Sequence, residues 1–323
     1  MRRWLIRIVV GLVVLLAPVV VYRAEVALAV VSWLAESARD VGPNRPVPWE
    51  QGPETAALPP SERPPNIVLI LADDMGWNDV STNGGGAGTG TVETPNIDSI
   101  ARDGVNFTWG YAANATCAPS RAAILSGRYG TRFGFEFTAT PAAMMPAMAV
   151  VMSADPTPRR PGLANFDARS TPTAEMGMPT GEISLAETLK KADYHTVHIG
   201  KWHVGEANAM AANDQGFDES LNMGGTLFLP EDHPDVVNSK QMFDPIDRFL
   251  WAAGGYAVRY NKGPAFEPEG HVADYYTDQA LEVIRANRNR PFFLYLAHWA
   301  IHTPLQATRA DYDAYPGIES HTE

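Results

Sequence analysis

The first feature of chemical interest is a lone cysteine, Cys117, in the stretch 117–128. It is the only cysteine in 323 residues, so no disulfide can form within the chain. Pro119 favours a helix start and Gly127 a helix end, which predicts a short helix with Cys117 at its N-terminus. Backbone N–H groups there favour anions, and Arg121 adds a cation with planar donors. An ordinary buried cysteine before a structural helix is the alternative interpretation.

Two adjacent carboxylates, Asp73 and Asp74, follow the continuous apolar run 66–72. The length and β-branching of this run predict a strand that is buried on both faces. Ligands of open α/β sheets bind at the carboxyl ends of the strands, and paired acids are hard oxygen ligands for Ca²⁺ or Mg²⁺. Taken alone, the pair also fits a solvated turn. Asp79 is a further candidate ligand, although a role in the turn fits it better.

Basic side chains follow two further runs with the character of strands. Lys201 and His203 come directly after the run 195–199, and His302 follows the fully apolar run 291–297. Solvated charge at a strand end is the simpler interpretation of each group alone. The carboxyl ends of parallel strands lie along one edge of a sheet, so we expect these side chains to gather there with the two aspartates.

Helical patterns lie between the strands. The run 94–105 has Ile97 and Ile100 on one face, which we expect to pack against the core. A capping box opens a helix over 184–191, and an amphipathic helix is predicted over 274–285. The segment 142–179 lacks sustained periodicity, and we interpret it as a surface excursion near the mouth of the site.

These motifs together resemble the sulfatase family. Residues 117–128, which read Cys-x-Pro-Ser-Arg followed by Leu-Ser-Gly-Arg, are similar to the signature whose cysteine is oxidised to Cα-formylglycine before folding is complete. Residues 73–76 resemble the metal-binding Asp-Asp-x-Gly motif. Residues 200–205 differ from the family's Gly-Lys-Trp-His-Leu-Gly element only at Val204, and His302 stands in a His-x-Pro step.

The resemblance implies a role for each matching residue at the nucleophile and the metal. Cys117 is expected to act as an aldehyde hydrate, which can attack sulfur and later expel sulfate by re-forming its carbonyl. Asp73 and Asp74, with residue 117, are expected to hold Ca²⁺ or Mg²⁺. Arg121 belongs to the Cys-x-Pro-x-Arg pattern that the formylglycine-generating enzyme recognises, which makes that enzyme an expected partner.

The resemblance also implies roles for the basic residues. Lys201 is expected to bind a sulfate oxygen, and His203 to take the proton from the hydrate when the covalent sulfate is expelled. His302 is expected near the leaving oxygen, with His298 as the alternative. The substrate implied is a sulfate ester, either a small molecule or a sulfated glycan.

The fold implied is the alkaline-phosphatase-like α/β three-layer sandwich with a large, mostly parallel sheet, over residues 64–323. The family also uses an Asp-Asn pair and a further lysine in a later segment. This sequence contains no Asp-Asn dipeptide and no lysine after Lys262. We therefore expect the N-terminal portion of a catalytic domain, with an incomplete cation site and an unprotected sheet edge.

The N-terminus carries three arginines among its first seven residues, followed by the apolar run 8–22. This pattern predicts a transmembrane anchor over 1–23, with the catalytic domain in the periplasm or extracellular space. A signal sequence cleaved near 27–29, which would release a secreted protein, is the alternative. Residues 24–63 are predicted to be a juxtamembrane segment and a proline-rich linker.

Charge and composition narrow the function classes. The chain has 25 Lys and Arg against 37 Asp and Glu, a net charge of -12, which argues against nucleic acid as a partner. Its hydrophobic fraction of 45% is ample for a core. Besides a sulfatase, two hypotheses remain open: a phosphodiester or phosphonate monoester hydrolase of the same superfamily, and a non-catalytic, membrane-tethered homologue.

Overall fold

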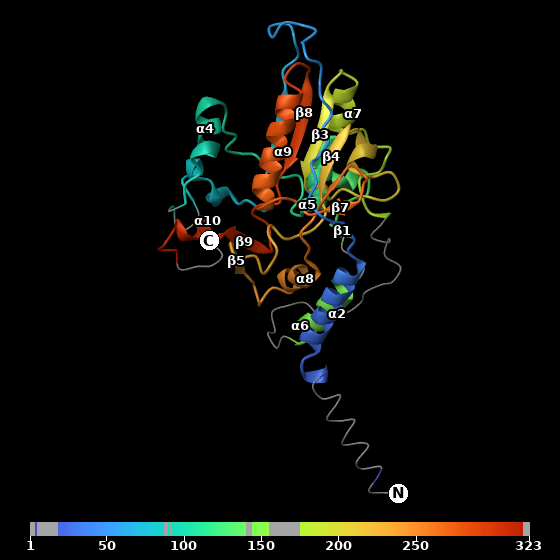
Figure 1. Ribbon diagram of the computed structural model, residues 1–323, viewed down its shortest axis with the longest axis vertical. Helices are drawn as coiled ribbons and strands as arrows, with labels where there is room; N and C mark the ends of the chain where they lie inside the picture. The colour runs from blue at the N-terminus through green and yellow to red at the C-terminus, as the bar shows by residue number, and fades with distance from the viewer. Residues whose placement is uncertain are drawn as a thin grey trace. The chain divides into compact units, whose positions relative to one another are not determined.

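The computed structural model describes residues 4, 19–86, 90, 92–139, 144–154 and 175–318, which divide into two compact units (Figure 1). The larger unit comprises Asp40–Ala139, Ala174–Ser239 and Gly255–Glu323. The smaller comprises Met1–Arg39, Thr140–Thr173 and Lys240–Gly254. Most of the predicted anchor over 1–23 lies outside the described residues. Within the described ranges, no helix combines the length and the apolar character that a membrane crossing requires.

A seven-stranded sheet forms the centre of the larger unit, in the order β1-β7-β6-β4-β3-β8-β2. Strands β2, β8, β3 and β4 run parallel to one another, β6 is antiparallel to both its neighbours, and β1 pairs in parallel with β7. The bounds are β1 Val41–Gly42, β2 Ile67–Leu71, β3 His195–Gly200, β4 Glu219–Met223, β6 Val258–Tyr260, β7 Ala265–Phe266 and β8 Phe292–Ala297. A separate pair consists of β5 Val236–Ser239 and β9 Leu305–Thr308.

Helices cover both faces of the sheet and so make three layers. Successive side chains of β8 point to opposite faces, and Leu294 and Tyr295 are both fully buried. On the Leu294 face lies α9 (Val272–Ala286), and on the Tyr295 face lie α5 (Cys117–Ser126) and α7 (Leu185–Lys190). The predicted α/β class with a mostly parallel sheet is thereby confirmed. The remaining short elements are α4 Pro95–Asp103, α10 Arg309–Asp313, and the 3₁₀ turns η1 Trp77–Asp79, η2 Ser81–Asn83, η3 Gly130–Arg132 and η5 Ala212–Gln215.

Strand β2 is an edge strand, and the prediction that both of its faces are buried is wrong. It pairs only with β8 among the described strands, and Val68 and Ile70 are 44% and 56% exposed. The apolar run indicated a strand correctly, but it carried no information about how many neighbours the strand has. Helix α4 also differs from expectation, because Ile97 and Ile100 are exposed and no α4 residue is buried.

The proline-rich segment forms no helix or strand over residues 43–66, as its proline content predicts, but it packs against the core of the larger unit. Strand β1 joins the sheet at the edge beside β7, and Trp49 is buried in the core on the α9 face. The Trp49 indole N–H donates to Gln279 Oε1 at 2.8 Å, and the Glu50 N–H donates to Glu219 Oε1 at 2.9 Å. Proline is compatible with this arrangement because the segment is extended and needs few ladder hydrogen bonds.

Among the described residues of the smaller unit, three helices pack together around Val31, Met144, Ala147 and Phe249. They are α2 (Arg23–Ala38), α6 (Met144–Ala154) and α8 (Pro245–Ala253). Helix α2 occupies part of the predicted juxtamembrane segment, and α6 part of the predicted surface excursion. Methionine and alanine are strong helix formers. Helix α6 therefore forms although its sequence lacks the periodic polar residues of an amphipathic helix. Residues 155–174 of the excursion lie outside the described residues.

Candidate active site

Three strand ends meet at the carboxyl edge of the sheet, as the sequence predicts. In the register of the sheet, Leu71 and Gly200 are both paired with Ala297. The loops that follow these strands are joined by backbone hydrogen bonds: the Lys201 N–H donates to Ala297 O at 2.8 Å, and the Asp73 N–H to Ala300 O at 3.1 Å. The segments that carry Asp73, Lys201 and His302 are therefore held side by side.

Asp73 lies at the centre of a buried charge cluster. Its Oδ1 is 3.0 Å from Arg121 Nη2 and its Oδ2 is 2.6 Å from Lys201 Nζ, and all three side chains are buried. Burial acts to raise the pKa of Asp73, but the charges of Lys201 and Arg121 hold that pKa below its usual value. Burial also lowers the pKa of Lys201, which the Asp73 carboxylate opposes. The cluster stays ionised because each charge has an opposite partner.

Arg121 is fixed on its second side as well. Its Nη1 donates to the Lys201 carbonyl oxygen at 3.0 Å and to the Tyr295 hydroxyl at 3.3 Å. The guanidinium therefore joins α5 to the ends of β3 and β8. This arrangement places the first turn of α5 against the carboxyl edge of the sheet.

Cys117 is the first residue of α5, as the sequence predicts, and Gly127 ends the helix in the left-handed conformation. Burial acts to raise the pKa of the Cys117 thiol, but hydrogen bonds from His203 and His302 and the charge of Lys201 lower it to about 4. The position therefore favours a negative charge strongly. It brings together residues from the α5 start and the ends of β3 and β8.

Two predicted site residues have strained backbones. Asp74 has φ 60° and His203 has φ 58°, in the left-handed region that side chains other than glycine rarely adopt. Such conformations persist only where the surrounding structure enforces them, and they concentrate at functional sites. The strain at both positions supports their assignment to the site.

Of the two histidines that follow β8, the structure places His302 in the site. Its Nε2 is 3.4 Å from Asp74 Oδ2, and it is one of the groups that lower the pKa of Cys117. His298 is half-buried and lies beside Tyr276 of α9, with 6.4 Å between the ring centroids. His298 is therefore a core residue on the α9 face.

Trp299 contacts two of the site residues, and the sequence analysis assigned it no role. Its indole stacks on the His302 ring, with 3.9 Å between centroids, and the Lys201 Nζ lies 4.2 Å from the indole centroid. The sequence showed only an aromatic residue two positions after a buried strand and three positions before His302. Nothing local indicated which side chains it would meet.

Other polar residues near the motifs have structural roles. Asp79 accepts a hydrogen bond from the Gly76 N–H at 2.6 Å, in agreement with the predicted turn. His195 Nε2 lies 2.8 Å from Glu219 Oε2, and His198 Nδ1 lies 2.9 Å from Ser220 Oγ, both within the interior. Both histidines are buried, and neither belongs to the predicted site.

The residues present fit part of a divalent-cation site. Asp73 and Asp74 are the hard oxygen donors that Ca²⁺ and Mg²⁺ prefer. Both oxygens of Asp73 already face cationic side chains, whereas the Asp74 side chain is 60% exposed. In the part of the chain that the structure describes, no three His, Cys, Asp or Glu side chains gather into a metal site. Further ligands would be needed to complete the coordination sphere.

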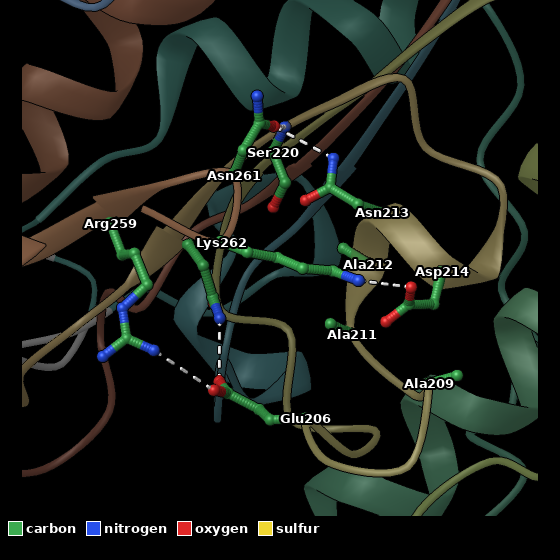
Figure 2. A pocket seen from close by; sticks show the side chains of 11 residues that line it. Glu206, Ala209, Ala211, Ala212, Asn213, Asp214, Ser220, Arg259, Asn261 and Lys262 are labelled. Atoms are coloured by element: carbon green, nitrogen blue, oxygen red, sulfur yellow. Dashed lines mark hydrogen bonds and ion pairs between the residues drawn. The ribbon is translucent and has the colours of Figure 1, made fainter. Parts of the chain in front are cut away.

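A cavity of about 360 Å³ lies along β4 and β6 and the loop that follows His203 (Figure 2). Its charged side chains are already paired with one another: Arg259 lies 3.7 Å from Glu206, and Lys262 contacts Asp214. None of the predicted site residues lines it. The cavity is therefore separate from the cluster around Cys117.

A family model described as Sulfatase matches residues 65–323. The chain belongs to the sulfatase family. Its curated relatives include N-acetylgalactosamine-6-sulfatase of Mus musculus, 36% identical over 76% of this chain and 42% of that protein, and arylsulfatase G of Homo sapiens, 32% identical over 76% and 42%. The family generally uses a formylglycine and a divalent metal.

Among solved structures, the sulfatase chain is similar to Ps i-CgsB, both alone and in complex with k-i-k-neocarrahexaose. Each comparison has a TM-score of 0.55, with 29% and 28% identity, and covers 80% of this chain and 49% of that one. The family and the alkaline-phosphatase-like fold are therefore as the sequence predicts. The chain spans about two-fifths of the length of the curated relatives that it matches.

Proposed function

We propose that this protein hydrolyses sulfate esters by means of a Cα-formylglycine made from Cys117. The observation that carries the proposal is the set of side chains around Cys117. His203, His302 and Lys201 lower the pKa of the Cys117 thiol, so together they stabilise an anion at that position, at the start of a helix. A reacting sulfate needs the same stabilisation, because negative charge builds on its oxygens in the transition state.

Two groups that complete the chemistry would be held by residues of this chain. As its hydrate, a formylglycine at position 117 would supply a nucleophile whose carbonyl re-forms when sulfate leaves. A divalent cation, Ca²⁺ or Mg²⁺, bound with the help of Asp73 and Asp74, supplies positive charge beside the sulfate oxygens. The formylglycine-generating enzyme is then a required partner.

The chain's own residues bind the sulfate and move protons. Lys201, held on one side by Asp73, directs its ammonium at a sulfate oxygen. His203 accepts the proton of the residue-117 hydrate, and His302, on the other side, donates to the leaving oxygen. Arg121 keeps the Asp73 carboxylate ionised and in place.

The proposed substrate class is a sulfated glycan. It is supported by relatives whose names refer to N-acetylgalactosamine-6-sulfate chemistry and by a similar solved protein in complex with k-i-k-neocarrahexaose. We further propose that residues 1–23 anchor the protein in a membrane, with the catalytic domain in the periplasm or extracellular space. Secretion after cleavage is the alternative.

The test is hydrolysis of 4-nitrophenyl sulfate by the chain co-expressed with a formylglycine-generating enzyme and assayed with millimolar Ca²⁺. Because the cation site lacks part of its ligands, we expect only slow hydrolysis by this chain. Cys117→Ala should abolish that activity, and Lys201→Ala should lower it by about 10²–10³-fold, the usual effect of losing one oxyanion-stabilising group. Lys262→Ala, which removes a lysine outside the site, should leave the rate unchanged.

Two outcomes would contradict the proposal. One is that no variant, including the wild type, hydrolyses the sulfate above background, which would favour the non-catalytic hypothesis. The other is faster, Cys117-dependent hydrolysis of bis(4-nitrophenyl) phosphate than of the sulfate ester, which would favour the phosphodiesterase hypothesis.

A further inference from the structure

Trp299 is held rigidly between the core and the predicted active site. Its side chain is only 4% exposed and belongs to the core cluster on the α9 face. The indole N–H donates to the Thr226 carbonyl oxygen at 2.9 Å. The ring therefore has a fixed orientation, set by a hydrogen bond and by packing.

The same indole makes two contacts with site residues. The His302 ring stacks on it, with 3.9 Å between centroids and 25° between planes. The Lys201 ammonium lies 4.2 Å from the indole centroid, over the ring. The face of an indole carries negative electrostatic potential, so it attracts an ammonium, and offset stacking restricts rotation of a neighbouring ring.

These contacts restrain side chains that would otherwise have freedom to move. Lys201 has four rotatable bonds, and its ion pair with Asp73 fixes the distance of Nζ from that carboxylate but not its direction. The indole adds a second fixed point for the ammonium. His302 lies 3.4 Å from Asp74 and contacts its own loop, and the stack on the indole adds a restraint on the plane of its ring.

We propose that Trp299 is a positioning residue, which sets both the direction of the Lys201 ammonium and the plane of the His302 ring. The part of this inference that concerns sulfate rests on the proposed function. The part that concerns the two side chains does not, because it refers only to their positions relative to the indole.

The first experiment is nuclear magnetic resonance on the ¹³C-labelled 323-residue chain. Protons above an indole face are shifted upfield, so the His302 ring protons and the Lys201 ε-protons of the wild type should resonate well upfield of their ordinary positions. The signals are assigned by their loss in His302→Gln and Lys201→Met. Trp299→Leu should return both signals toward ordinary positions, and Trp299→Phe should retain part of the shift.

The second experiment is calorimetric titration with inorganic sulfate. Trp299→Leu should bind sulfate about tenfold more weakly, the scale of losing a desolvated cation–π contact and the order it imposes. Trp299→Phe, which keeps an aromatic face, should recover most of that affinity. Trp49→Leu is the matched control, because it removes a buried indole of the same core cluster without contacting either residue.

The outcomes test separately whether Trp299 positions the two side chains and whether it supports sulfate binding. Ordinary chemical shifts for His302 and Lys201 in the wild type, or equal shifts in the wild type and Trp299→Leu, overturn the positioning role. Equal sulfate affinities for Trp299→Leu, Trp49→Leu and the wild type overturn its link to the anion. Upfield signals that respond to Trp299→Leu, in a wild type that binds no sulfate, support the positioning role and count against the proposed function.

Discussion

Asp73 is the residue on which the other charges of the site depend. It is 4% exposed, and its two oxygens are occupied by Arg121 and Lys201. Arg121 and Lys201 bring two cations to the carboxyl edge of the sheet in a protein of net charge -12. Asp74, which lies 3.4 Å from His302, adds a second and more exposed carboxylate to the same site.

We predict that Lys201→Met destabilises the fold by about 3 kcal/mol, because it removes one partner of a buried ion pair and leaves Asp73 with a single cation. Urea unfolding followed by circular dichroism measures the change. Lys262→Met is the control: it breaks a pair whose lysine is 57% exposed, and it should cost at most about 1 kcal/mol. Equal losses for the two variants would show that the buried cluster contributes no special stability.

Part of the site could be predicted at this scale and part could not. Asp73, Lys201 and His302 were identified because each follows a strand, and parallel strands align their carboxyl ends. The pairing of Arg121 with Asp73 and the stacking of Trp299 on His302 were not identified, because they depend on the side-chain directions of segments far apart in the sequence. Short-range pattern indicates which residues reach the edge of the sheet, but not which of them touch.

At the scale of elements, a polar group in the interior joins three neighbouring strands. Glu219 of β4 accepts hydrogen bonds from His195 of β3 at 2.8 Å, from the Tyr260 hydroxyl of β6 at 2.6 Å and from the Glu50 N–H at 2.9 Å. Burial acts to raise the pKa of Glu219, but these hydrogen bonds hold it below its usual value. The carboxylate therefore fixes strand order and also anchors the proline-rich segment.

This arrangement makes stability depend on pH. Because the pKa of Glu219 is lower in the folded than in the unfolded chain, its contribution is complete above the unfolded value of about 4.3 and is lost as pH falls toward the folded value. Glu219→Gln should therefore flatten the fall of the urea midpoint between about pH 4.5 and pH 3. Glu282→Gln, on the surface of α9, should leave that slope unchanged. Identical slopes for the wild type and Glu219→Gln would contradict the assignment.

Local patterns predicted some elements well and others poorly. The capping box of Ser184 and Glu187 forms as expected, and β3 and β8 are buried along their whole length. Strand β2 and α4 differ from expectation because burial depends on what packs against an element, and an apolar run does not specify its neighbours. Helix α6 was not predicted, because its methionine- and alanine-rich sequence does not alternate between apolar and polar residues at the helical period.

At the scale of the whole molecule, folding and modification of Cys117 compete. Ala118, Pro119 and Arg121, which belong to the motif that the modifying enzyme reads, are buried in the folded chain. Under the proposed function, an enzyme could read this stretch only before α5 packs against the sheet. We therefore predict that conversion of Cys117 precedes folding and that the folded protein is not a substrate.

The central claim is that residue 117 works as a formylglycine, and the most direct measurement is the mass of the tryptic peptide 103–121. Co-expression with a formylglycine-generating enzyme should yield this peptide with an aldehyde in place of the Cys117 thiol. The same enzyme added to the purified, folded chain should leave the thiol unchanged. A peptide that carries only the thiol after co-expression would contradict the claim.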